Sequence, residues 1–178
     1  NTGSGGITYS DNDDYTLTGN LLASGQTISL TSLNGAIVQT GGVITGWTPA
    51  AAAFEGISLT QANQVTSLGL MSTNTGALAY RDVDGFALTD SLFTTGAVSL
   101  TSDDGTITQS AGAIQAASLS ASAANGINLS RTNATAAVSL INTTSGDIVY
   151  RNVNGIAASS ISNVGRVVTL TADNGAII

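Results

Sequence analysis

The feature that most constrains the fold of this chain is a long internal sequence repeat. The segments SLTSLNGAI, SLTSDDGTI and TLTADNGAI begin at Ser29, Ser99 and Thr169, so successive starts differ by 70 in residue number, and YRDVDG at Tyr80 aligns with YRNVNG at Tyr150. No gap is needed from Ser29 to the end of the chain, which is typical of a domain built from repeated substructures. We therefore expect one domain over residues 1–178, made of a partial repeat (1–25), two repeats (26–95 and 96–165) and a second partial repeat (166–178).

Strand-like runs within each repeat are short. In the second repeat, aliphatic pairs such as Ile127–Leu129 and Val138–Leu140 alternate with polar residues and are separated by corners that contain Gly, Asn or Asp. A strand with one or two inward aliphatic residues forms no core alone, but it can stack on the equivalent strand of the next coil. At roughly 20 to 25 residues per coil, the chain is predicted to form an all-β, parallel β-helix with about three coils per repeat. At a strand spacing of about 4.8 Å, seven or eight coils would make a rod of about 35 Å.

One segment fits this pattern less well. Residues Thr48–Glu55 read TPAAAAFE, which favours one or two turns of helix or an expanded loop. The same segment aligns with SLSASAAN in the next repeat, which is typical of a strand. Trp47, the only Trp, precedes it and aligns with Ala117. Trp47 is therefore the candidate contact residue, with packing in the core as the more frequent alternative.

The composition excludes several kinds of chemistry. Charged residues make up 8% of the chain, and His, Cys and Lys are absent. The commonest general base, the thiol nucleophile, the Schiff-base amine and disulfide bonds are therefore unavailable. A net charge of −7 opposes binding to nucleic acid, and no apolar run reaches the roughly 20 residues of a membrane span. We expect no enzyme activity, no cofactor, no nucleic-acid partner and no membrane insertion.

The first acidic candidates are Asp82 and Asp84. Their spacing of two residues suits a carboxylate pair of the kind found in polysaccharide-cleaving β-helices. One repeat later the same positions are Asn152 and Asn154. Asn replaces Asp readily in a turn, where both side chains cap local N–H groups, but not in an acid–base pair. The sequence therefore favours a structural role for these positions.

The densest acidic run is formed by Asp11, Asp13 and Asp14. Its carboxylates would suit a hard cation such as calcium, which prefers oxygen ligands. However, the chain contains neither the EF-hand pattern nor the glycine-rich nonapeptide of calcium-binding β-rolls. A solvated corner is therefore the favoured interpretation, with a metal site as the alternative.

The adjacent residues Asp103 and Asp104 are followed by Gly105. In the other copies the acidic pair becomes Leu-Asn or Asp-Asn, whereas the glycine does not change. The predicted corner residues are Asn34, Gly35, Asp104, Gly105, Asn174 and Gly175. At each corner we expect the Asn or Asp before the glycine to adopt positive φ and the glycine to supply a position without Cβ.

Three further residue types recur at the repeat spacing. A position that returns in every repeat is more readily explained as a packing or ladder element than as a substrate clamp. The residues predicted to have this structural role are Tyr80, Tyr150, Arg81, Arg151, Asn63 and Asn133.

The repeat unit resembles those of filamentous-haemagglutinin-like exoproteins. The segments that carry the resemblance are SLTSDDGTITQSAGAI, ASLSASAANGINLS, NATAAVSL and SGDIVYRNVNG, and it extends over essentially the whole chain. These exoproteins are very large bacterial surface or secreted proteins exported by two-partner secretion or related autotransporter routes. The resemblance implies a right-handed parallel β-helix, an extracellular or cell-surface location, and a role in adhesion, aggregation or biofilm formation. It supplies no catalytic residue.

The leading hypothesis is therefore a structural stalk or filament segment of a large extracellular bacterial surface protein. Two alternatives remain open: a self-assembling filament subunit that stacks end to end, and a carbohydrate-active or glycan-binding β-helix. The expected partners are neighbouring coils of the same protein or identical subunits, with surface glycans or proteins of a host or a bacterium as further candidates.

Overall fold

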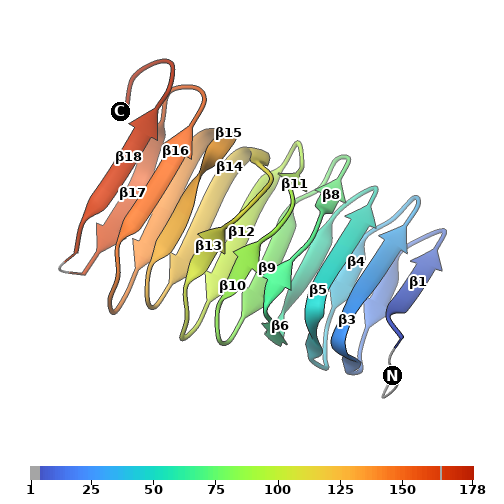
Figure 1. Ribbon diagram of the computed structural model, residues 1–178. Coiled ribbons are helices and arrows are strands. Elements are labelled where there is room, and N and C mark those ends of the chain that lie inside the picture. The colour runs from blue at the N-terminus through green and yellow to red at the C-terminus, as the bar shows by residue number, and fades with distance from the viewer. Residues whose placement is uncertain (1–4, 165) are drawn as a thin grey trace.

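The computed structural model of the chain is a parallel β-solenoid of about eight coils (Figure 1). It describes residues 5–164 and 166–178, and every regular element in these ranges is a strand. The predicted all-β parallel β-helix is thus confirmed. The expected partial repeat 1–25 and repeat 96–165 include residues 1–4 and 165, which lie outside the described residues.

The strands form three parallel ladders, which we call faces 1, 2 and 3. Face 1 contains β1 (Ile7–Asp11), the second parts of β3 (Leu21–Ser32) and β5 (Ile44–Ala53), β8 (Met71–Thr73), β11 (Leu92–Phe93), the first part of β14 (Ile114–Ala123) and the middle of β15 (Ile127–Asn142). Face 2 contains β2 (Tyr15–Leu17), β4 (Ile37–Gln39), the first part of β6 (Ile57–Val65), β9 (Leu78–Asp82), β12 (Ala97–Ser102), the second parts of β14 and β15 (Ile127–Asn142), and β17 (Ala157–Asn163). Face 3 contains the first parts of β3 and β5, the end of β6, β7 (Ser67–Leu68), β10 (Phe86–Leu88), β13 (Ile107–Gln109), the first part of β15, β16 (Ile148–Asn152) and β18 (Val168–Ala172).

A coil is shorter than a third of the sequence repeat. On face 1, Ile28 is the partner of Ile7 and Pro49 is the partner of Ile28, so each coil there advances the residue number by 21. One sequence repeat, which advances it by 70, therefore covers about three and a third coils. Equivalent strands of successive repeats consequently lie on successive faces: residues 28–32 on face 1, 98–102 on face 2 and 168–172 on face 3. The repeat turns about the solenoid axis by one face each time.

The core is a stack of inward aliphatic side chains. In β9 the buried residues Leu78, Tyr80 and Asp82 alternate with partly exposed ones. Along face 2, Leu78 is the ladder partner of Val98, which is in turn the partner of Leu119, and all three are buried. Burial of one such side chain is worth about 1.5 to 3 kcal/mol, so stability accumulates only as coils are stacked.

The alanine-rich segment Thr48–Glu55 is not a helix, because residues up to Ala53 belong to β5. This strand pairs with β3 on one side and with β8 on the other. The strand interpretation that follows from the repeat alignment is therefore correct. Pairing on both edges satisfies the backbone, and it overrides the modest intrinsic helix preference of alanine.

The expectation of positive φ before each corner glycine is wrong, because no described non-glycine residue has positive φ. The residues concerned are Asn34, Asp104 and Asn174. Gly175 has a φ of 103°, which favours glycine. Gly105 is needed for a different reason, because the backbone of the preceding coil lies too close to leave room for a Cβ. A Cβ on Gly105 would overlap with the carbonyl oxygen of Asp84, and one on Gly35 would overlap with the backbone nitrogen of Asp14. Close stacking of successive corners therefore explains both of these glycines.

Candidate functional site

The carboxylate of Asp82 is buried at the end of β9 and is fully hydrogen-bonded. Its Oδ2 accepts hydrogen bonds from the backbone N–H of Val65 and from the hydroxyl of Tyr80, both at 2.9 Å. Its Oδ1 accepts from the N–H groups of Asp84 (3.0 Å) and Gly85 (3.1 Å). Burial raises the pKa of the Asp82 carboxyl, although these hydrogen bonds act in the opposite direction.

Asp84 does not form a carboxylate pair with Asp82. The Asp84 side chain is exposed at the corner after β9, and its contact with Asp82 is made by its backbone. One of the two carboxylates is thus in the core and the other is in solvent. An arrangement for general acid–base work on a shared substrate would need both to face the same space.

The equivalent corner of the next repeat contains Asn152, which is also buried. Its Oδ1 accepts from the N–H of Thr135 (3.0 Å) and the hydroxyl of Tyr150 (3.1 Å). Its amide donates to the carbonyl oxygens of Thr135 (3.0 Å) and Gly155 (2.9 Å). Asp82 and Asn152 therefore fill the same structural position and accept from the same kinds of donor, but Asn152 also donates hydrogen bonds, whereas Asp82 only accepts.

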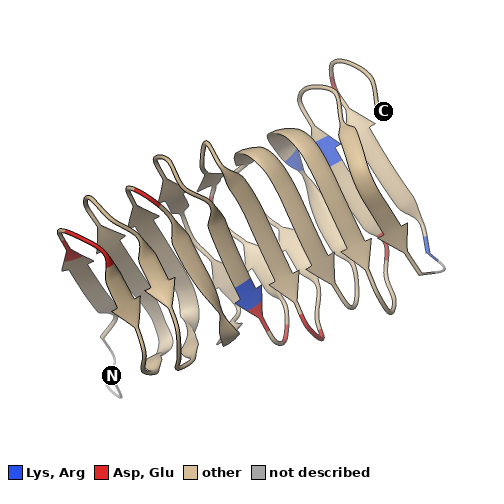
Figure 2. Ribbon diagram, turned by 180° about the vertical axis from the view of Figure 1, so that it is seen from behind, with Lys and Arg blue, Asp and Glu red and all other residues tan. Residues whose placement is uncertain are grey.

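The acidic run near the N-terminal end forms the corner between β1 and β2 (Figure 2). Asp11 accepts from the hydroxyl of Tyr9 (2.9 Å) and from the backbone N–H of Asp13 (3.2 Å), and the latter bond is the main reason why its pKa is lowered. Oδ1 of Asp14 accepts from the N–H of Ala36 in the next coil (2.6 Å). Among the described residues, no three acidic side chains are grouped so that they could hold a metal ion.

Asp103 and Asp104 lie at the corner after β12, where they have different partners. Asp103 forms a two-pronged ion pair with Arg81, with distances of 2.7 Å from Nη2 and 3.1 Å from Nε. Asp104 is exposed, and its carbonyl oxygen accepts from the amide of Asn125. The equivalent ion pair one repeat later joins Arg151 Nε to Asp173 at 2.9 Å.

Asn63 is part of a buried amide cluster that connects three coils. Its Oδ1 accepts from the side-chain amide of Gln39 and from the N–H of Ile44, each at 2.9 Å. Its Nδ2 donates to the carbonyl oxygens of Leu59 (3.1 Å) and Arg81 (3.2 Å). The pairing of β6 with β9 shifts register between Leu59 and Asn63, so the amide satisfies backbone groups at an irregular corner.

The second repeat contains the same cluster, formed by Asn133 and Gln109. Here Oδ1 of Asn133 accepts from Gln109 (2.9 Å) and from the N–H of Ile114 (2.8 Å), and its amide donates to Leu129 and Arg151. The two asparagines are among the predicted structural residues, whereas their glutamine partners are not. Glutamine recurs at the repeat spacing, at positions 39 and 109, and this recurrence is the signal in the sequence that points to them.

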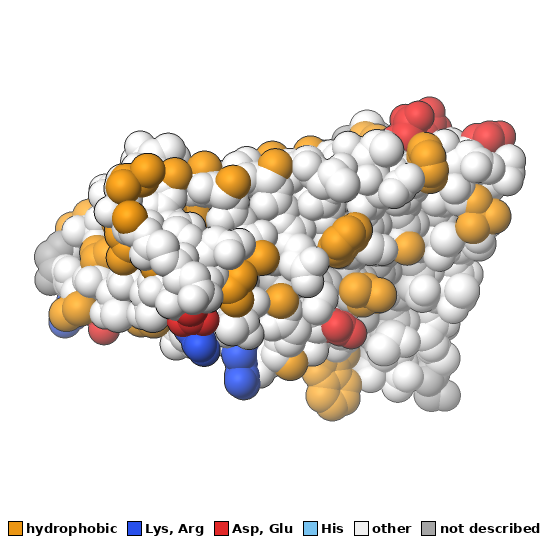
Figure 3. All heavy atoms as spheres, turned by 90° about the horizontal axis from the view of Figure 1, so that it is seen from above, with side chains coloured by type: hydrophobic (Ala, Val, Ile, Leu, Met, Phe, Trp, Pro, Cys, Tyr) orange, Lys and Arg blue, Asp and Glu red, His pale blue; other side chains and the backbone are white. Residues whose placement is uncertain are grey.

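Trp47 lies in β5 near the corner between faces 3 and 1, and its side chain is exposed, with 58% of the residue accessible. Its carbonyl oxygen accepts from the hydroxyl of Ser67 (3.0 Å), which fixes the backbone there. Figure 3 shows apolar side chains interspersed with polar atoms over one side of the solenoid. The alternative of core packing for Trp47 is therefore wrong, and its side chain is available for contact.

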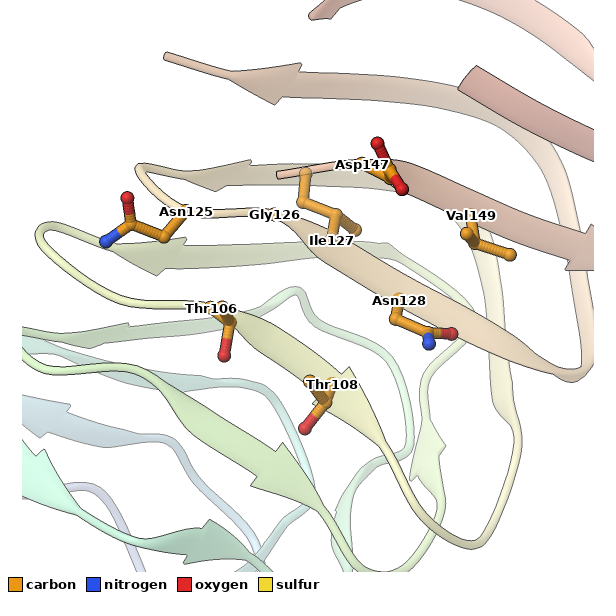
Figure 4. A pocket seen from close by; sticks show the side chains of 8 residues that line it. All are labelled: Thr106, Thr108, Asn125, Gly126, Ile127, Asn128, Asp147 and Val149. Carbon is orange, nitrogen blue, oxygen red and sulfur yellow. The ribbon is translucent and has the colours of Figure 1, made fainter. Parts of the chain in front are cut away.

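A polar hollow on the surface lies on face 3 and has a volume of about 220 Å³ (Figure 4). Its lining residues are Thr106, Thr108, Asn125, Gly126, Ile127, Asn128, Asp147 and Val149. Asp147 is the only acidic residue among them, and its Oδ1 accepts from the N–H of Val167 (3.1 Å). A hollow with one carboxylate can offer hydrogen bonds to a hydroxylated molecule, but it lacks the carboxylate pair of glycoside hydrolysis.

Comparison of the chain with family models, curated proteins and solved structures finds no match. The resemblance to haemagglutinin-like repeats therefore remains a prediction. In the described part of the chain, no helix is long and apolar enough to cross a membrane.

Proposed function

We propose that this chain is a structural stalk segment of a large extracellular bacterial surface protein that mediates adhesion, aggregation or biofilm formation. The observation that supports this most is the stacking itself, because parallel ladders follow the solenoid on all three faces. The extracellular location and the adhesive role are suggested by the resemblance of the repeats.

The contacts made by the acidic and amide side chains also support a structural role. Asp82 is occupied by four donors in the core, Asp103 is paired with Arg81, and the Asn63 amide connects coils. Groups used in this way stabilise corners and are not available to bind or transform a ligand. The outward surface then carries mainly Ser, Thr, Asn and Ala, which suits a stalk that does not itself adhere.

A stalk of this kind has a defined reach. With strands stacked at about 4.8 Å, about eight coils span about 38 Å, and each further sequence repeat adds about 16 Å. Successive repeats also turn by one face, so any outward feature that occurs once per repeat is displayed on each face in turn.

The proposal can be tested by placing the chain between a bacterial surface anchor and a binding domain. We expect the solenoid to raise the binding domain by about 38 Å, measured by fluorescence distance from the membrane, and to leave the affinity of the domain unchanged. A flexible Gly/Ser linker of the same number of residues is the control, because it should give a broad distribution of distances. A broad distribution for the chain itself would contradict the stalk.

The alternative function, glycan binding, can be tested with the same surface-displayed chain. Cells that display the chain without the binding domain should not bind to a glycan array. Binding that is lost in Asn128→Ala, a substitution in the polar hollow of face 3, would replace the stalk by a glycan-binding function.

A further inference from the structure

We propose that Asn154 is a site of spontaneous deamidation, in which the backbone nitrogen of Gly155 attacks the side-chain amide. The corner between β16 and β17 (Figure 1) contains both residues, and the side chain of Asn154 is exposed there. The inference goes beyond the proposed structural role and does not depend on it, because it concerns the chemistry of one corner.

The reaction needs only water as a co-reactant. Hydroxide removes the proton from the N–H of Gly155, and the nitrogen forms a bond with Cγ of Asn154. The C–N bond of the side-chain amide breaks, and its NH2 group takes up a proton from water and leaves as ammonia. Water then adds to one of the two carbonyl groups of the resulting cyclic imide, and the ring opens to aspartate or to isoaspartate. A glycine in the second position favours ring closure, because it has no Cβ to crowd the approach.

The chain contains four Asn-Gly pairs, with asparagine at positions 34, 125, 154 and 174. In three of them the side-chain nitrogen of the asparagine donates a hydrogen bond to the preceding coil. The acceptors are Oδ1 of Asn12 for Asn34 (3.0 Å), the carbonyl oxygen of Asp104 for Asn125 (2.5 Å) and the carbonyl oxygen of Val153 for Asn174 (3.0 Å). The side chain of Asn154 makes no hydrogen bond with any described residue. Its Cγ can therefore turn toward the following N–H without breaking a hydrogen bond.

The N–H of the following glycine is the second difference between the pairs. Gly35 donates to the hydroxyl of Ser32 (3.1 Å), and Gly126 donates to Oδ1 of Asn142 (2.9 Å). Among the described residues, none accepts a hydrogen bond from the N–H of Gly155. A hydrogen-bonded N–H gives up its proton less readily, because the bond must be broken first. The attacking nitrogen therefore forms more easily at Gly155.

The equivalent corner of the first repeat explains why the Gly155 N–H has no acceptor. There the N–H of Gly85 donates to Oδ1 of Asp82 at 3.1 Å. In the second repeat Asn152 occupies the buried position, and its amide nitrogen donates to the carbonyl oxygen of Gly155 at 2.9 Å. An amide nitrogen cannot accept a hydrogen bond. The change from Asp to Asn at the buried position thus removes the acceptor from the glycine that follows.

The two products would affect this corner differently. Aspartate at position 154 would reproduce the first repeat, in which the exposed residue is Asp84. Isoaspartate would lengthen the backbone where it is closely packed, since a Cβ on Gly155 would already overlap with the carbonyl oxygen of Ala176 in the next coil. We expect the isoaspartate form to melt at a lower temperature than the parent and the aspartate form to melt with it.

Peptide mapping by mass spectrometry tests the assignment, with the folded chain incubated at mildly alkaline pH. Each rate is divided by the rate of the same site in denaturing urea, which removes the effect of the neighbouring residues. We expect the ratio for Asn154 to exceed those for Asn34 and Asn125 by about tenfold or more. Asn174 should be intermediate, because its side chain is held but no described residue accepts from the N–H of Gly175. Equal ratios at Asn154, Asn34 and Asn125 would overturn the proposal.

A matched pair of variants tests the cause by building the same site in the first repeat. Asp84→Asn creates a new Asn-Gly pair in which the Gly85 N–H is still bound by Asp82, so the new pair should react slowly. Adding Asp82→Asn removes that acceptor, and position 84 should then react about as fast as Asn154. Circular dichroism verifies that both variants are folded, and Asn154 serves as the internal reference in each. The same slow rate at position 84 in both variants would overturn the role of the free glycine N–H.

Discussion

The two complete repeats place different side chains in equivalent buried corners, Asp82 in the first and Asn152 in the second. Each accepts a hydrogen bond from a tyrosine hydroxyl and another from a backbone N–H of the preceding coil. Asp82 receives two further backbone donors, whereas Asn152 donates to the carbonyl oxygens of Thr135 and Gly155. What the two repeats share is therefore a satisfied set of hydrogen bonds and not a charge, which is the expected property of a scaffold position.

The amide clusters differ from this corner because they are the same in both repeats. Asn63 with Gln39, and Asn133 with Gln109, make matching contacts with the coils on either side. We expect the largest effects there. Replacing Asn63 or Asn133 by Ala should lower the free energy of unfolding by about 3 kcal/mol, since backbone and glutamine groups would be left buried and unsatisfied.

Urea denaturation of both variants measures this effect. The two losses should agree to within about 0.5 kcal/mol and add in the double variant, because the clusters share no residue. The matched control is Asn128→Ala on the exposed surface, for which we expect a change below about 0.5 kcal/mol. A loss at Asn63 similar to that of the control would show that the amide clusters do not stabilise the coils.

The substitution Asn152→Asp tests the difference between the two corners. It would place a carboxylate oxygen against the carbonyl oxygens of Thr135 and Gly155, which now accept from the amide. We expect a loss of about 2 to 3 kcal/mol at pH 7. Acidification should restore part of it, because a protonated carboxyl can again donate. Urea denaturation at pH 7 and pH 4 measures both changes, and a variant as stable as the parent at pH 7 would contradict the assigned hydrogen bonds.

The reverse substitution, Asp82→Asn, should change the free energy of unfolding by a smaller amount, of the order of 1 kcal/mol at neutral pH. The pKa of Asp82 is raised in the folded chain by burial. The folded state therefore binds this proton more tightly than the unfolded state, so the stability contribution is present below the unfolded pKa and is lost as pH rises through the folded pKa. The variant should lose less stability than the parent as the pH is raised from about 4. Parallel stability curves for parent and variant would show that Asp82 is not buried in this way.

The smallest effects are expected at the exposed ion pairs of the two repeats. Arg81→Gln should lower stability by less than about 0.5 kcal/mol, and Arg151→Gln should leave the melting temperature unchanged, because solvent and salt screen both pairs. Melting temperatures at low and high salt measure both effects. A loss above about 1 kcal/mol in Arg81→Gln, or a clear drop in the melting temperature of Arg151→Gln, would indicate that the corner ion pairs hold the coils together.

The fold follows from the sequence because every repeat presents the same alternation of inward aliphatic and outward polar residues. Ile28, Val98 and Val168 each begin such a run, although they lie on three different faces. Because the pattern is the same on every face, the repeat predicts the solenoid but not the turn of one face per repeat. Which face a strand joins depends on the length of the coil, and the corner residues set that length through close backbone approach.

The candidate site was predictable only in part. The change from Asp82 to Asn152 indicated a structural position, but burial and the donors from Val65 and Thr135 depend on a coil 17 residues away in the sequence. Trp47 could be recognised as irregular because it has no counterpart in the next repeat. Its exposure follows from its place at a corner between two faces, which local sequence does not reveal.

A coil shorter than a third of the sequence repeat makes each repeat turn by one face. Double-cysteine variants distinguish this coil length from three coils per repeat, since Ser99 lies opposite Ser120 in the solenoid. If three coils filled one repeat, Ser99 would instead lie opposite Ser122. We predict an intramolecular disulfide in Ser99→Cys/Ser120→Cys and none in Ser99→Cys/Ser122→Cys, as read by mass spectrometry of the oxidised chain. Cross-linking of the second pair in preference to the first would show instead that three coils fill one repeat.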